Sequence, residues 1–129
     1  MKTTILLIED NEQNRYLATF LLEKAGYAVV PAADGHLGIE LAARVLPHLI
    51  LLDIQLPTMD GYAVAHALRR NPQLGDIPIV AVTSYAMVGD REKALAAGCT
   101  GYLEKPIDPE TFVAEVQRYL KTTRTEINP

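Results

Sequence analysis

Five polar residues stand at or just past the ends of short apolar runs: Glu9, Asp10, Asp53, Thr83 and Lys105. Each run reads as a buried strand, so parallel strands would bring all five side chains to one edge of one sheet. Crowded carboxylates repel one another, and a site that keeps several usually holds a cation. A hydroxyl and an ammonium suit a phosphoryl oxygen. The residue types therefore predict a site that accepts a phosphoryl group.

The strands that position these residues are visible as continuous apolar runs. Residues 5–8, 49–52 and 79–82 are apolar without alternation, which is typical of strands buried on both faces. Shorter runs at 28–30 and 102–103 predict strands nearer the edges of the sheet. We therefore expect five strands.

Apolar residues at helical spacing predict four helices between and after these strands. Their stripes are Leu17, Phe20 and Leu21; Leu37, Leu41, Ala42 and Val45; Ala63, Val64, Ala67 and Leu68; and Phe112, Val113, Val116 and Leu120. Asp34 is suited to cap the second of these helices, and Asp108 followed by Pro109 is suited to begin the last. Gly26 and Pro47 are expected to end the first two.

A further helix is predicted around residues 88–97, which are rich in alanine and carry few large apolar anchors. Such a loosely held element is either a switching surface or a plain solvated helix, and the sequence leaves both readings open. With it, strand and helix alternate five times. This pattern predicts an α/β, flavodoxin-like doubly wound parallel sheet in the order 2-1-3-4-5, whose sites lie at the carboxyl ends of the strands.

Length and composition agree with one globular domain. The chain has 129 residues, 49% of them hydrophobic and 22% charged, and we expect a domain at 1–122, a short polar tail at 123–129 and no output domain. A net charge of -4 disfavours a nucleic-acid surface. The four apolar residues before Glu9 are too few for a signal peptide or a membrane span, so we expect a cytoplasmic protein. Cys99 is the lone cysteine, expected as a small packed residue.

Asp53 ends the strongest central strand, where a carboxylate can attack a phosphoryl donor and form an aspartyl phosphate. Taken alone, it could also be an Asp that merely begins a loop. Glu9 and Asp10 lie on the neighbouring strand, and three carboxylates with only oxygen ligands point to Mg²⁺. Asp10 or Asn11 could in addition cap the helix that starts at Glu12.

Thr83 and Lys105 have roles that the same site would explain. The Thr83 hydroxyl could donate to a phosphoryl oxygen, although a lone threonine is also ordinary strand material. Lys105 would pair with a carboxylate at rest and with phosphate afterwards. Pro106 follows it, and a cis Lys-Pro bond would fix where the lysine points.

From about residue 5 to residue 120, the chain resembles a response-regulator receiver domain of the CheY-like superfamily. The matching motifs, in order, are Glu9-Asp10, Asp53 followed by Leu56-Pro57, Met59-Asp60-Gly61, Val82-Thr83-Ser84 and Tyr102-Leu103-Glu104-Lys105-Pro106. Residues 80–87, 89–90 and 98–99 are similar to the stand-alone regulators of the DivK type and to the receivers of hybrid kinases.

The resemblance implies that Asp53 takes phosphate from a histidine kinase or a histidine phosphotransfer protein. It also implies a Mg²⁺ site made by Glu9, Asp10, Asp53 and the backbone carbonyl of Gln55. The protein would then be a signalling switch, not an enzyme.

The resemblance further implies that Thr83 and Lys105 bind the phosphoryl group while Tyr102 turns inward. The surface of the fourth helix, fifth strand and fifth helix would then change shape and bind a downstream protein. We expect the chain to be a monomer or a weak dimer, and we expect it to contact neither nucleic acid nor membrane. Tyr102 could instead be a fixed aromatic of an edge strand.

Three departures and three alternatives accompany the resemblance. Glu9, Gln55 and Tyr85 differ from the commoner family pattern, and the last two bear on how long the phosphate lasts.

The alternatives are other functions that the same residues could serve. An aspartate-based phosphatase would need a second Asp where Gln55 stands. A module that never takes phosphate lacks support because all five polar positions are intact, and flavin binding is disfavoured by the acidic loop at 10–13. The histidines, His36, His48 and His66, show no metal-ligand spacing.

Overall fold

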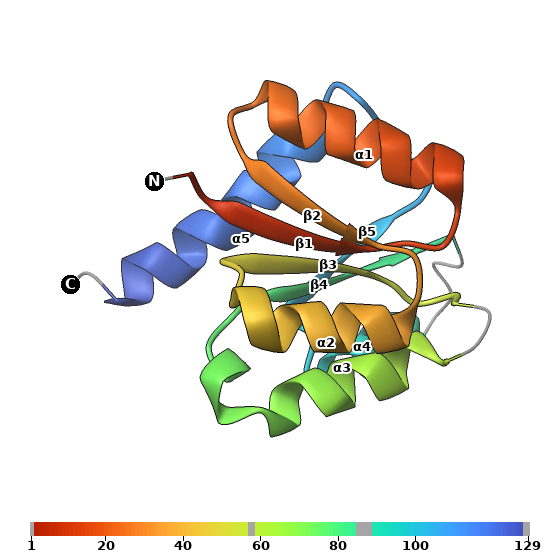
Figure 1. Ribbon diagram of the computed structural model, residues 1–129, viewed down its shortest axis with the longest axis vertical. Helices are drawn as coiled ribbons and strands as arrows, with labels where there is room; N and C mark the ends of the chain where they lie inside the picture. Colours follow the sequence, from red (N-terminus) through yellow and green to blue (C-terminus); the bar gives the residue numbers. More distant parts are fainter. Residues whose placement is uncertain (1, 57–58, 85–88, 128–129) are drawn as a thin grey trace.

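The computed structural model describes residues 2–56, 59–84 and 89–127. Its sheet has five parallel strands in the predicted order, β2-β1-β3-β4-β5 (Figure 1). Their bounds are β1 Thr4–Ile8, β2 Ala28–Ala32, β3 Leu49–Asp53, β4 Ile79–Thr83 and β5 Gly101–Glu104. The strands that contain the long apolar runs, β1, β3 and β4, occupy the middle, and the strands with the two shorter apolar runs occupy the edges, as the sequence predicted.

Five α-helices connect and follow the strands: α1 Glu12–Lys24, α2 Gly35–Val45, α3 Gly61–Arg70, α4 Asp90–Ala96 and α5 Phe112–Ile127. A single 3-10 turn, η1 Pro72–Leu74, follows α3. Helices α1 and α5 cover one face of the sheet, and α2, α3 and α4 cover the other (Figure 1). No helix in the described ranges is long and apolar enough to cross a membrane.

The helix ends show why the chain turns where it does. Asn11, not Asp10, caps α1, because its side-chain oxygen accepts a hydrogen bond from the backbone N–H of Asn14 at 2.9 Å. Asp34 caps α2 in the same way and accepts from the N–H of Leu37 at 2.8 Å. The Asp10 carboxylate is therefore not the cap of α1, and its residue belongs to the loop between β1 and α1.

The last helix begins later than the sequence predicted and continues past residue 122. Residues 109–111 form a turn, in which the N–H of Glu110 donates to the Asp108 carboxylate at 2.9 Å and the N–H of Thr111 donates to the Asp108 carbonyl at 3.1 Å. The helix proper then begins at Phe112 and continues to Ile127, so residues 123–127 extend α5. The fourth helix was expected at 88–97; residue 88 lies outside the described ranges, and α4 covers Asp90–Ala96.

Two apolar clusters fill the space between the sheet and its helices. Some residues of the predicted stripes lie outside both: Phe20 is 52% exposed, Leu37 39% and Val45 37%, and Ala63 is also exposed. A helix buries only the arc that faces the sheet, and the apolar stripe of the sequence is wider than that arc. Cys99 is buried, which raises the pKa of its thiol to about 11 and confirms a packing role.

Candidate functional site

All five predicted residues lie at the carboxyl edge of the sheet. Glu9 and Asp10 follow β1, Asp53 and Thr83 are the last residues of β3 and β4, and Lys105 follows β5. The backbone holds these ends in register, since the N–H of Lys105 donates to the carbonyl of Thr83 at 2.8 Å. The parallel topology thus brings together residues that are far apart in the sequence.

Three carboxylates form the centre of the site. One oxygen from each of Glu9, Asp10 and Asp53 lies within 4.8 Å of the others. Glu9 and Asp53 are buried, whereas Asp10 is exposed. Burial raises the pKa of Asp53 above its ordinary value of 3.8, and the hydrogen bond and the charge of Glu9 act in the same direction. An all-oxygen donor set with this spacing fits a hard divalent cation such as Mg²⁺.

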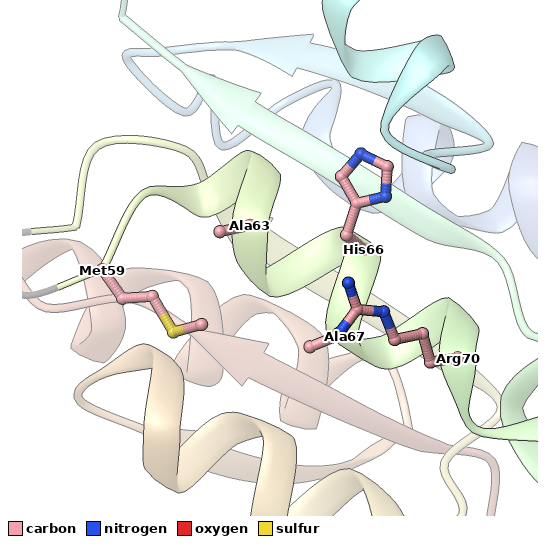
Figure 2. A pocket seen from close by; sticks show the side chains of 5 residues that line it. All are labelled: Met59, Ala63, His66, Ala67 and Arg70. Atoms are coloured by element: carbon pink, nitrogen blue, oxygen red, sulfur yellow. The ribbon is translucent and has the colours of Figure 1, made fainter.

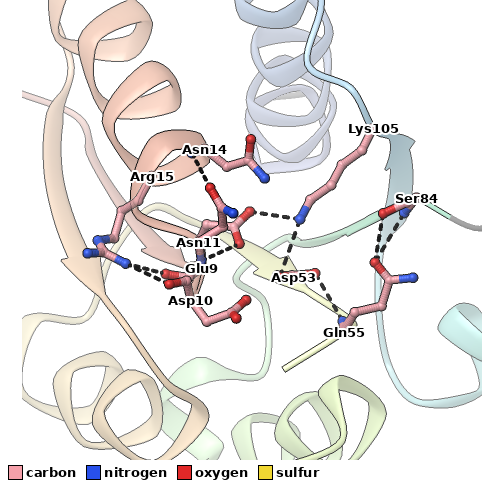
Figure 3. Close-up of polar contacts among 9 residues, drawn as sticks. All are labelled: Glu9, Asp10, Asn11, Asn14, Arg15, Asp53, Gln55, Ser84 and Lys105. Carbon is pink, nitrogen blue, oxygen red and sulfur yellow. Dashed lines mark hydrogen bonds and ion pairs between the residues drawn. The ribbon is translucent and has the colours of Figure 1, made fainter. Parts of the chain in front are cut away.

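Lys105 supplies the positive charge within this cluster (Figure 3). Its Nζ lies 2.9 Å from Oε1 of Glu9 and 3.3 Å from Oδ2 of Asp53. Burial acts to lower the pKa of Lys105, but the hydrogen bond to Glu9 and the two carboxylate charges outweigh it and raise the pKa. The pairing at rest is the one predicted, and the Lys105-Pro106 bond is cis as predicted.

Gln55 connects Asp53 to the loop after β4. Its backbone N–H donates to Oδ1 of Asp53 at 3.0 Å, and its side-chain oxygen accepts from the Ser84 hydroxyl at 2.9 Å (Figure 3). The sequence indicated that Gln55 flanks the phosphoryl position but gave no sign of its bond to Ser84. Pro57, which belongs to one of the matching motifs, and Tyr85, which departs from the family pattern, lie outside the described residues.

Arg15 is a site neighbour that the sequence did not single out. It lies on α1, and its guanidinium reaches back to the loop after β1, where Nη1 donates to the carbonyls of Glu9 at 2.9 Å and Asp10 at 3.3 Å (Figure 3). In the sequence, the indication that Arg15 could reach the site was its position on the first predicted helix, close to Glu9 and Asp10.

The family follows from a comparison with known proteins. The model of the response regulator receiver domain matches residues 5–117, nearly the whole chain. The chain belongs to the response-regulator receiver family. The Polar-differentiation response regulator DivK of Brucella anthropi is 38% identical over 120 residues, which cover 93% of this chain and 98% of that protein.

Two solved structures have folds similar to that of this chain. The chemotaxis protein CheY4 of Vibrio cholerae has a TM-score of 0.89 and 30% identity, and the match covers 92% of this chain and 99% of that one. The receiver domain of a sensor histidine kinase from Pseudomonas aeruginosa has a TM-score of 0.86 and 36% identity, covering 94% of this chain and 99% of that one. That neighbour was solved with a magnesium ion coordinated in its active site cleft.

Two residues of the predicted switch lie on the neighbouring strands β4 and β5. Thr83 is buried at the end of β4, and Tyr102 is half-buried on β5, where it packs against the cluster under α2, α3 and α4. Whether phosphate moves either side chain stays a prediction.

A hollow of about 390 Å³ lies along α3 of the receiver domain (Figure 2). Met59, Ala63, His66, Ala67 and Arg70 line it. These residues offer one imidazole and one guanidinium but no carboxylate, so the hollow lacks the chemistry of the acidic cluster.

The raised pKa of Asp53 predicts that Asp53→Asn stabilises the metal-free receiver domain. The folded state holds this proton more tightly than the unfolded state does, so stability falls as the pH rises from 3.8 through the raised pKa. Asparagine avoids that loss, and we expect its unfolding midpoint at pH 7 to lie a few degrees above that of the wild type.

Below about pH 3 the carboxyl is protonated in both states, and the advantage of asparagine should vanish. Thermal unfolding in EDTA at both pH values, followed by circular dichroism, measures this difference. The exposed Asp76 offers a matched control, because Asp76→Asn removes a charge without relieving burial. A less stable Asp53→Asn protein at pH 7 would contradict the argument.

Proposed function

We propose that this receiver domain accepts a phosphoryl group on Asp53 from the phosphohistidine of a histidine kinase or a histidine phosphotransfer protein. The observation that supports this most directly is the cluster of three carboxylates, within 4.8 Å of one another, with Lys105 between two of them. The family relationship supports the same chemistry.

Glu9, Asp10, Asp53 and the backbone carbonyl of Gln55 are the groups that would hold Mg²⁺. They are oxygen donors, which Mg²⁺ prefers, and the three carboxylates already converge. When bound, Mg²⁺ supplies positive charge that screens the carboxylates and the incoming phosphoryl oxygens.

In the transfer step, a carboxylate oxygen of Asp53 attacks the phosphorus. The new O–P bond forms as the P–N bond to the donor histidine breaks, and the electron pair of that bond stays on the imidazole nitrogen. Lys105 already lies 3.3 Å from Asp53, so its ammonium is placed to stabilise the negative charge on the phosphoryl group.

We propose that the phosphate is then read by Thr83, Lys105 and Tyr102. A group of nearly two negative charges attracts the Thr83 hydroxyl and the Lys105 ammonium, and Tyr102 turns into the space that opens. The face made by α4, β5 and α5 changes and binds a downstream protein. In this proposal the chain works in the cytoplasm, where ATP is available to the kinase, as a monomer or weak dimer.

The competing function is a phosphatase that uses the same nucleophile. Gln55 stands where such an enzyme needs a carboxylic acid, and its side-chain oxygen already accepts from Ser84. We therefore expect negligible release of phosphate from phosphomonoesters in the presence of Mg²⁺. Sustained turnover would favour the phosphatase.

Intact mass spectrometry after incubation with phosphoramidate and Mg²⁺ tests the phosphorylation itself. The wild type and Asp76→Asn should gain one phosphoryl group, because Asp76 is exposed and away from the cluster. Asp53→Asn should gain none, since the amide is not a nucleophile of this kind. An equal adduct on the Asp53 variant, or none on the wild type, would refute the proposal.

A further inference from the structure

Arg15 binds the loop that carries two of the three carboxylates through its backbone. Both of its contacts there are with carbonyl oxygens, at 2.9 Å for Glu9 and 3.3 Å for Asp10 (Figure 3). A charged donor makes a stronger hydrogen bond to a carbonyl than a neutral donor does. The guanidinium thus clamps the backbone from which these acidic side chains project.

The loop needs such a partner because it lies beyond the sheet. The N–H of Glu9 still donates to the carbonyl of Ala32 at 2.9 Å, but β1 itself ends at Ile8. The pairing of β1 with β2 and β3 also ends at Ile8, and a half-buried carbonyl without a partner is unfavourable. Arg15 provides both bonds from one nitrogen.

The two acids depend on this clamp to different degrees. The Glu9 carboxylate is held at both oxygens, by Lys105 at 2.9 Å and by the N–H of Asn11 at 3.1 Å. The Asp10 carboxylate is exposed, and the backbone of its residue accepts a hydrogen bond from Arg15. Losing Arg15 should therefore release Asp10 more than Glu9.

We infer that Arg15 is a positioning residue for divalent-cation binding: its guanidinium fixes the Glu9–Asp10 backbone and thereby holds the Asp10 carboxylate within reach of Asp53. The inference rests on the proposed function, in which these acids bind Mg²⁺. Arg15 acts through the loop and does not touch the cation.

Electrostatics alone predicts the opposite change in Mg²⁺ affinity when Arg15 is removed. A cationic side chain near a metal site repels the metal, so its removal would strengthen Mg²⁺ binding if charge were its only effect. Positioning predicts weaker binding on removal. The direction of the change therefore separates the two effects.

The experiment is a Mg²⁺ titration of the ¹⁵N-labelled full chain, followed by amide chemical shifts. Arg15→Met keeps an apolar stem and removes the donors, and we expect the dissociation constant to rise about tenfold, as for other groups that orient metal ligands. Arg15→Lys keeps the charge on a shorter side chain and should raise the dissociation constant about threefold. Lys24→Met removes a charge from the far end of α1 and should change it by less than about twofold.

Phosphorylation by phosphoramidate gives a second measurement. In Arg15→Met the Mg²⁺ concentration for half-maximal rate should rise in parallel with the dissociation constant. The rate at saturating Mg²⁺ should stay within about twofold of the wild type, because high cation concentration compensates for a poorly placed ligand.

The outcomes separate this inference from the function on which it rests. A wild type that binds no Mg²⁺ overturns the proposed function and the inference together. A wild type that binds Mg²⁺, with Arg15→Met binding as tightly or more tightly, overturns the inference alone, as does a rate that saturating Mg²⁺ fails to restore. If circular dichroism shows that Arg15→Met is unfolded, Arg15→Lys decides, and a dissociation constant at or below that of the wild type overturns the inference.

Discussion

We expect Gly61→Ala to destabilise the receiver domain by about 3 kcal/mol, although alanine is the better helix former. Gly61 begins α3 directly against the end of β3. A Cβ atom there would lie 2.4 Å from Cα of Ile54, 2.8 Å from its carbonyl oxygen and 2.9 Å from the carbonyl oxygen of Asp53. These are backbone atoms, so no side-chain rotation relieves the contact.

Denaturant unfolding followed by circular dichroism measures this loss. Gly75→Ala is the matched control, because the nearest atom to its Cβ is the Pro72 carbonyl oxygen at 3.4 Å. We expect that variant to stay within about 0.5 kcal/mol of the wild type. Gly61→Ala with wild-type stability would show that α3 moves away from the strand end freely.

The same contact connects helix packing to the site. The N–H of Gly61 donates to the carbonyl of Ile54 at 3.1 Å, and Ile54 follows Asp53. Pushing α3 outward therefore shifts the loop that contains Gln55, whose carbonyl is a proposed Mg²⁺ ligand. A folded Gly61→Ala protein should bind Mg²⁺ more weakly than the wild type.

The strands and their polar ends could be predicted because the physics there is simple. A run such as residues 49–52 has no polar face, which is typical of a strand buried on both faces, and its alternation with helices favours a parallel sheet. Right-handed crossovers then leave few topologies, and all of them bring the carboxyl ends of these strands to one edge. Asp53 and Lys105, far apart in the sequence, consequently meet at 3.3 Å.

The features that the sequence left out depend on loop conformation. The Gln55–Ser84 hydrogen bond and the reach of Arg15 back to Glu9 join loops whose paths follow from packing, and no periodicity records them. The turn at 109–111 has the same origin, because one Asp108 side chain suits either a helix cap or a turn. The meeting of the polar side chains at the strand ends was thus predictable, and the groups that orient them were not.

Lys105→Met should lower the free energy of unfolding of the metal-free protein by about 3 kcal/mol, because it leaves two buried carboxylates without their cation. The Nζ atom lies 2.9 Å from Glu9 and 3.3 Å from Asp53, and the side chains of these acids are 4% and 2% exposed. Water can do little to screen the repulsion that remains. Lys93→Met, on the exposed face of α4, is the matched control and should change stability little.

Added Mg²⁺ should then stabilise the Lys105→Met protein more than it stabilises the wild type. In the wild type the cation meets carboxylates that are already partly neutralised by the ammonium; in the variant it meets the full charge, and we expect roughly tenfold tighter binding. Thermal unfolding across a Mg²⁺ series, with and without EDTA, measures both effects. Equal stabilisation of the two proteins by Mg²⁺ would mean that Lys105 and the cation do not share the same carboxylates, and the proposed exchange of Lys105 between acid and phosphate would lose its basis.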